Sequence, residues 1–129
     1  MRTFFLILFG VFSTLALSAC ASNEANAPVQ AVENYLTALV EKDANRLTTL
    51  SCGEWEDDAI LALDSFQAVE TRLEGLACEQ TGTDRDTALV LCNGSIVATY
   101  DGEDQQMDLS RFTYQVLQEG GEWLVCGTR

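Results

Sequence analysis

Residues 28–40 read Pro-Val-Gln-Ala-Val-Glu-Asn-Tyr-Leu-Thr-Ala-Leu-Val, and this stretch is the strongest helix signal in the chain. Its apolar residues recur at helical spacing and form one stripe, while polar side chains occupy the other faces. Proline is well tolerated in the first turn, so the helix is predicted to begin near Pro28. Asp43 can cap a second short helix over residues 44–50. Residues 54–68 predict a third helix, whose acidic start suits the helix dipole.

The hydrophobic period changes after the third helix, from helical spacing to alternation. Residues 69–78 alternate apolar and polar side chains, and Gly75 is expected to mark a bulge. Further strands are predicted at 87–100, 109–118 and 123–127, with turns at 81–86, 101–102 and 120–121. This order predicts an α+β domain over residues 28–129, in which N-terminal helices pack on one face of a curved antiparallel sheet of about four strands.

Four cysteines fall within this predicted domain, at Cys52, Cys78, Cys92 and Cys126. None is spaced as Cys-x-x-Cys and the chain has no histidine, so a zinc site is disfavoured and two disulfides are expected in an exported domain. The predicted hairpins place Cys78 opposite Cys92. Cys92 and Cys126 would flank one strand about 9.6 Å apart, beyond the roughly 7 Å between Cα atoms that a disulfide allows. The predicted pairs are therefore Cys78–Cys92 and Cys52–Cys126.

The N-terminal segment ends in Leu17-Ser18-Ala19-Cys20, after Arg2 and an apolar run too short to span a membrane comfortably. This pattern resembles the lipobox of bacterial lipoproteins. The resemblance implies a signal peptide over residues 1–19, lipidation of Cys20, and a lipidated cysteine and tether over residues 20–27. An ordinary secretory signal, which would leave Cys20 as a spare thiol, and an uncleaved anchor helix are the alternatives.

The lipobox resemblance also implies a location. It places the protein in the bacterial cell envelope, exported and anchored to a membrane through lipid. Ala21 follows Cys20 where an inner-membrane signal would have Asp, so the pattern resembles outer-membrane sorting if the source is Gram-negative.

The chain is strongly acidic, with 20 acidic and 7 basic residues and a formal net charge of −13. This balance argues against nucleic-acid binding, which needs basic residues to displace counterions from phosphates. It also argues against a peripheral grip on anionic lipid headgroups. Solubility and mutual repulsion between anchored copies explain the acidity better than a cationic substrate does.

In pattern and element order the chain resembles the nuclear-transport-factor-like superfamily, a cone-shaped α+β fold shared with SnoaL-type cyclases and ketosteroid isomerases. The resemblance covers about residues 28–127 and rests on three stretches: Val32-x-x-Tyr35-Leu36-x-Ala38-Leu39, Asp43-x-x-x-Leu47-x-x-Leu50 and Gly121-Glu122-Trp123-Leu124-Val125. The fold implies a cavity between helices and sheet, which some members use for apolar ligands or catalysis. It also allows a homodimer through the open face of the sheet. Fold alone assigns no function.

Three hypotheses on function follow from the sequence. The first is a non-enzymatic domain that presents a surface or pocket to another envelope protein or a small apolar ligand. The second is a small apolar-ligand-binding module with a true cavity. Aromatic residues at core spacing would either line such a cavity or fill it. The pocket candidates are Tyr35, Trp55, Phe66, Phe112 and Tyr114.

The third hypothesis is a SnoaL-like enzyme that uses a buried carboxylate. The absence of histidine excludes a Ser-His or Cys-His pair. Asp64 with Tyr100 or Tyr114 is the candidate for a base and its partner, and the simpler interpretation is a solvated helix residue and tyrosines of the wall or core.

No cofactor and no metal site is expected. The acidic residues of 54–58 are attributed to the start of a helix. Those of 101–108 lack the spacing of a calcium loop and are attributed to a hydrophilic hairpin turn.

Overall fold

The computed structural model describes residues 25–129. The predicted signal peptide, the lipidation site Cys20 and the first part of the tether lie outside the described residues. Within the described part of the chain, no helix combines the length and apolar character needed to cross a membrane.

Three helices form one layer of the domain: α2 (Ala27–Glu41), α3 (Ala44–Thr49) and α4 (Glu56–Ser65). The predicted cap of the second helix is confirmed, because the Asp43 side chain accepts a hydrogen bond of 3.0 Å from the Arg46 backbone N–H. Helix α4 is shorter than predicted at both ends. Before the helix, the backbone N–H of Trp55 donates a hydrogen bond to the Cys52 carbonyl. After the helix, the backbone N–H of Gln67 donates one to the Asp64 carbonyl.

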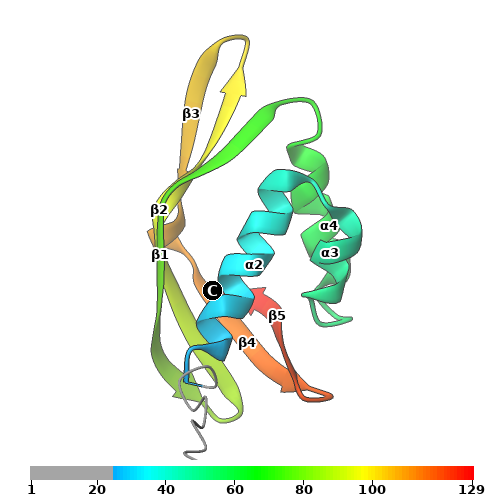
Figure 1. Cartoon of the computed structure of the whole chain (residues 1–129), viewed down its shortest axis with the longest axis vertical. Helices are drawn as coiled ribbons and strands as arrows, with labels where there is room; N and C mark the ends of the chain where they lie inside the picture. Colours follow the sequence, from blue (N-terminus) through cyan, green and yellow to red (C-terminus); the bar gives the residue numbers. More distant parts are fainter. Residues whose placement is uncertain (1–24) are drawn as a thin grey trace, which may run out of the picture.

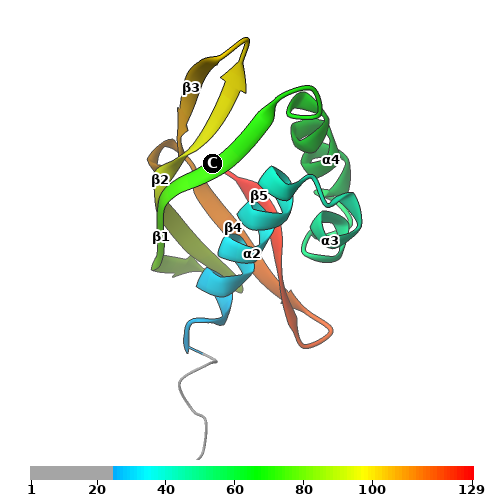
Figure 2. The same cartoon turned by 45° about the horizontal axis from the view of Figure 1, so that its top comes forward.

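Five antiparallel strands form the other layer: β1 (Glu70–Asp84), β2 (Thr87–Tyr100), β3 (Glu103–Asp108), β4 (Thr113–Glu119) and β5 (Glu122–Thr128). Strand β2 pairs with β4 through residues 88–91 and with β3 through residues 95–100. The short 3₁₀ turn η1 (Leu109–Arg111) separates β3 from β4. The sheet curves around α2, and the β2–β3 hairpin projects as an arm beyond the helices (Figures 1 and 2).

The fifth strand, β3, corrects the prediction of about four. All six of its residues are exposed, so it carries no alternating apolar face by which a sequence pattern could reveal it. The backbone still pairs with β2, because ladder hydrogen bonds do not require buried side chains. For the same reason β1 continues to Asp84, through residues that were expected to form a turn.

Two glycines mark the place where the β1–β2 pair passes from the body of the domain into the arm. The predicted bulge at Gly75 is confirmed, because the pairing register shifts between Glu74 and Ala77. Across from it, Gly94 has φ 103°, and a Cβ there would lie 2.6 Å from the carbonyl oxygens of Glu74 and Gly75. Glycine is therefore required at Gly94 by both conformation and space.

The hydrophobic core fills the space between α2 and the sheet. The predicted stripe of α2 supplies Val32 and Leu36, and the strands supply Val90, Val116 and Val125, each at most 1% exposed. Burial of each such side chain stabilises the fold by about 1.5–3 kcal/mol.

Two disulfides support this core, and they join the pairs that the hairpin geometry predicts. Cys52–Cys126 links the loop before α4 to β5 across a sequence separation of 74 residues, with Cα atoms 4.9 Å apart. Cys78–Cys92 links directly paired residues of β1 and β2, with Cα atoms 4.0 Å apart. The first therefore connects the helical layer to the sheet, and the second closes one hairpin.

Candidate functional site

Three of the aromatic pocket candidates meet in the interior of the cone. Tyr35 projects from α2, Tyr114 from β4 and Trp55 from the segment before α4. The Trp55 indole N–H donates a hydrogen bond of 3.1 Å to the Tyr35 hydroxyl, and the rings of Tyr35 and Tyr114 lie 6.4 Å apart between centroids. Both tyrosines belong to the buried core, with Trp55 packed against it.

Burial dominates the chemistry of these tyrosines. It raises the pKa of the Tyr114 phenol, and the neighbouring Tyr35 adds to that shift. Burial also raises the pKa of Tyr35, although the hydrogen bond from Trp55 acts in the opposite direction. Both phenols therefore remain protonated near neutral pH and serve here as packing groups with one internal hydrogen bond.

The carboxylate candidate lies elsewhere. Asp64 is exposed on α4, so the structure separates it from Tyr114 in the core. Among residues 25–129, no Asp or Glu is buried, and the buried polar residue is Ser51, whose hydroxyl donates to the Leu47 carbonyl at 2.8 Å. The described part of the chain therefore lacks the buried carboxylate that the enzyme hypothesis requires.

The remaining two aromatic candidates line an open groove. Phe66 lines it from the residue after α4, and Phe112 lines it from the residue between η1 (Leu109–Arg111) and β4. The groove has a volume of about 320 Å³, near the lower end of the range for small-molecule sites. Its full lining is Phe66, Ile96, Ala98, Tyr100, Gln105, Gln106, Met107, Asp108, Arg111 and Phe112.

The strand register explains how the groove forms. Ile96 and Ala98 of β2 face the same side as the core, and β3 places Met107 beside Ile96. The arm extends beyond the helices (Figure 2), with Tyr100 paired to Glu103 at its outer end and Met107 paired to Ile96 nearer its base. Tyr100 is 38% exposed and Met107 43% exposed, and Leu61 on α4 is the third large apolar residue exposed in the described chain. Two of the three thus belong to one groove.

The rim of the groove is polar. The Asp108 carboxylate accepts hydrogen bonds from the Ser110 backbone N–H at 2.9 Å and from its hydroxyl at 2.7 Å. These bonds, with a smaller contribution from the positive charge of Arg111, hold the pKa of Asp108 below its usual range. Arg111 makes no salt bridge with any residue of 25–129.

A second hollow, of about 510 Å³, lies at the opposite end of the β1–β2 hairpin. It is larger, but polar and charged side chains dominate its lining, among them Gln80, Thr83, Arg85, Asp86 and Gln118. Trp123 is its largest apolar side chain. Its apolar lining is Ala88, Leu117 and Trp123, fewer apolar residues than line the groove.

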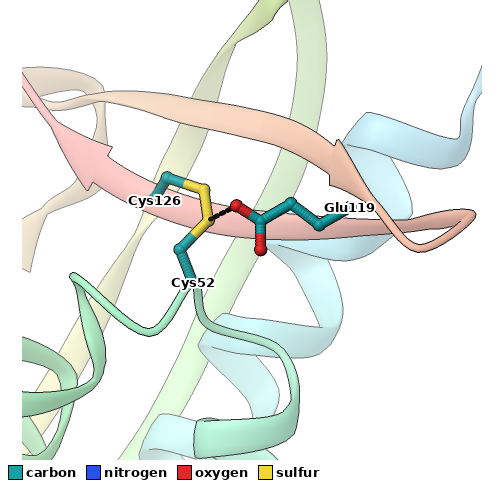
Figure 3. A group of neighbouring side chains, drawn as sticks. All are labelled: Cys52, Glu119 and Cys126. Atoms are coloured by element: carbon teal, nitrogen blue, oxygen red, sulfur yellow. Dashed lines mark hydrogen bonds between the residues drawn. A yellow bond between two sulfur atoms is a disulfide. The ribbon is translucent and has the colours of Figure 1, made fainter.

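Cys52, Glu119 and Cys126 are the one group of potential metal ligands close together in residues 25–129. Figure 3 shows the Glu119 carboxylate reaching the Cys52–Cys126 disulfide, 3.6 Å from the Cys52 sulfur. A disulfide sulfur carries neither a proton to donate nor the thiolate charge that a metal needs. In the oxidised protein this group is consequently a structural bridge beside a surface carboxylate.

No protein-family model and no curated protein matches this chain. Among solved structures, it is similar to Aln2 from a Streptomyces species, with a TM-score of 0.54 and 11% identity over 79% of this chain and 85% of that one. The fold is nuclear-transport-factor-like. The predicted fold class, helices followed by a curved antiparallel sheet, is therefore confirmed.

Two weaker similarities accompany this one. A SEC-C motif containing protein from Rhodopseudomonas palustris has a TM-score of 0.49 and 15% identity, over 81% of this chain and 79% of that one. A variant of a protein named Rd1NTF2_05 also has a TM-score of 0.49, with 11% identity over 81% of this chain and 96% of that one.

Sequence reasoning found Phe66 and Phe112 as pocket residues, named Tyr100 only as an alternative partner of Asp64, and missed Met107. Tyr100 continues the alternation of Ile96 and Ala98, and that signal alone could have placed it on the inner face of the strand. Met107 is a single apolar residue within a polar segment. It becomes part of an apolar wall only through pairing with β2.

Proposed function

We propose that this protein is a non-enzymatic binding module of the bacterial envelope, held at a membrane through lipid on Cys20, which takes a small apolar ligand in the groove between α4 and the β2–β3 arm. The observation that carries the proposal is the clustering of Tyr100 and Met107 beside Phe66, Ile96 and Phe112. Exposed apolar side chains that gather in one concave place mark binding sites more often than scattered ones do.

The alternatives are less well supported. A SnoaL-like enzyme of the kind considered above needs a buried carboxylate, and none of the Asp and Glu side chains in residues 25–129 is buried. A ligand deep in the cone would need space where Tyr35, Trp55 and Tyr114 pack together. A ligand in the outer groove requires neither.

The ligand proposal is tested by native mass spectrometry of the full chain, purified from its host membrane and then incubated with decanol as an uncharged apolar probe. We expect one added mass, carried over from the cell or supplied by decanol. Met107→Glu should weaken this binding about tenfold or more, because it places a charge in the apolar wall. Leu61→Glu is the matched control, since Leu61 is 70% exposed and does not line the groove. Absence of any bound mass, or equal binding by Met107→Glu, would contradict the proposal.

The anchor is tested separately by metabolic labelling with palmitate. The unaltered chain should incorporate label, and Cys20→Ser should lose it. Equal labelling of the two chains would contradict the proposal that Cys20 carries lipid.

A further inference from the structure

The groove contains a cationic group without a partner, which is unusual in so acidic a chain. Three other arginines pair with carboxylates: Arg46 with Glu41, Arg72 with Glu74 and Asp104, and Arg129 with Asp84. Lys42 donates to the Val69 carbonyl. Within residues 25–129, this leaves Arg85 and Arg111 as the basic side chains with neither an ion pair nor a side-chain hydrogen bond.

Both guanidinium groups line a hollow with some apolar side chains, but only Arg111 lines the groove that holds the exposed Tyr100 and Met107. Arg85 lies at a polar turn, on the hollow with Gln80 and Asp86. Arg111 lines the groove together with Phe66 and Phe112.

The nearest acid in the sequence is already engaged. One oxygen of the Asp108 carboxylate accepts both hydrogen bonds from Ser110, and this closes the turn η1 locally. Asp108 therefore caps the turn, and although the charge of Arg111 acts on it, the two side chains form no salt bridge. A planar guanidinium with free N–H donors is well suited to bind a carboxylate or a phosphate, which can accept two parallel hydrogen bonds.

We infer that the natural ligand of the groove is an anionic amphiphile, whose head binds the Arg111 guanidinium and whose apolar chain lies against Phe66, Ile96, Met107 and Phe112. This inference rests on the proposed function, because it names the class of ligand for the same groove. The head carries a carboxylate, as in a fatty acid, or a phosphate, as in a phospholipid headgroup.

The charge of the whole chain opposes this preference at long range. At physiological ionic strength, however, charges beyond about 8 Å are largely screened. The charged side chains of the groove wall are Arg111 and Asp108. Asp108 keeps its negative charge and can only accept hydrogen bonds, so Arg111 is the charged group that can donate hydrogen bonds to an anionic head.

The test compares four photo-reactive probes on the full chain, purified from its host membrane and reconstituted in phosphatidylcholine nanodiscs. Decanoic acid, decyl phosphate, decanol and decylamine each carry a diazirine in the alkyl chain, and cross-links are located by tandem mass spectrometry. Arg111→Gln removes the charge and Arg111→Lys retains it. Arg85→Gln makes the same change of charge away from the groove, so it controls for the net charge of the chain.

We expect at least one of the two anionic probes to cross-link to groove residues, with Tyr100 and Met107 the main sites. Arg111→Gln should raise the concentration needed for half-maximal labelling by about tenfold, as expected for loss of a charge-assisted hydrogen bond. Arg111→Lys should recover part of this loss. Arg85→Gln should label like the unaltered chain, and labelling by decanol should not depend on Arg111.

Each other outcome has a separate meaning. Labelling by decanoic acid alone supports a free fatty acid as the source, and labelling by decyl phosphate alone supports a phospholipid headgroup. Equal labelling by decanol and both anions, without an effect of Arg111→Gln, overturns the inference that the ligand has an anionic head. The proposal that the groove binds an apolar ligand would still hold. Preference for decylamine also overturns it. Failure of all four probes to label the groove contradicts the proposed function itself.

Discussion

Strand β2 passes through two different environments. Its first half, residues 88–91, lies between β1 and β4, and its second half, residues 95–100, lies between β1 and β3. In the first half Val90 is fully buried, whereas at the far end of the second half Tyr100 is 38% exposed. The apolar alternation is similar in both halves. The difference comes from the helical layer, which covers the body of the sheet and stops short of the arm (Figure 1).

Strands β4 and β3, which pair with the two halves of β2 on the side away from β1, show the same contrast. Strand β4 buries Tyr114 and Val116 against the helices, whereas all six residues of β3 are exposed. A strand can therefore be held by its backbone in one region and by its side chains in the other. Ile96, Val97 and Ala98 in the second half of β2 are still buried. The large apolar side chains that this region leaves exposed are Tyr100 and, on β3, Met107.

The largest expected effects concern the disulfides, both of which lie in the body. Replacing Cys52 and Cys126 with alanine should lower the free energy of unfolding by about 4 kcal/mol, because this bridge closes a long loop in the unfolded chain. Replacing Cys78 and Cys92 should cost about 3 kcal/mol, since their loop is short. Urea unfolding monitored by circular dichroism measures both values. The reverse order would show that the two bridges do not act mainly through loop closure.

A second test compares one apolar residue from each region. Leu36→Ala should destabilise the domain by about 3 kcal/mol, because Leu36 is 1% exposed and truncation leaves a cavity. Met107→Ala should change stability by less than about 0.5 kcal/mol. Thermal unfolding provides the measurement. If Met107→Ala were as destabilising as Leu36→Ala, the arm would have to be regarded as part of the core.

A third destabilisation, smaller than those of the disulfides and of Leu36→Ala, is expected at the junction of body and arm. Gly94→Ala should cost about 2 kcal/mol or more, because the new methyl group would meet the carbonyl oxygens of Glu74 and Gly75 and φ is positive there. Gly82→Ala is the matched control in β1, where a Cβ meets nothing within 4 Å. Equal stability of the two variants in urea unfolding would show that the bulge is not a fixed joint.

Most of the body was predictable from the sequence because its signals are local. The stripe of α2, the Asp43 cap and the Gly75 bulge each depend on a few neighbouring residues. The disulfide pairs could be predicted because hairpin turns bring Cys78 opposite Cys92 and leave Cys92 and Cys126 too far apart. These inferences survive a register error of a residue or two. Cys126, for example, lies at a bulge between the partners of Gln115 and Val116.

The arm and the site were less predictable because they depend on pairing between distant segments. Strand β3 has no apolar period, so its strand character comes only from β2. The aromatic residues gave an incomplete guide: Phe66 and Phe112 line the groove, while Tyr35, Trp55 and Tyr114 pack inside the domain. Composition does not distinguish an aromatic residue that lines a space from one that fills it, because that depends on the distance between layers.

The sequence by itself determined the order of helices and strands, the acidic charge and the pairing of the cysteines, because periodicity, turns and loop geometry act over short distances along the chain. It also carries the lipobox pattern at Cys20, whose consequence for location remains a prediction. Only the tertiary structure decided that Asp64 is a surface residue, that the cone interior is packed, and that Tyr100, Met107 and Arg111 share one groove. The physical reason is that burial and proximity depend on how far the helical layer extends over the sheet, which no local pattern encodes.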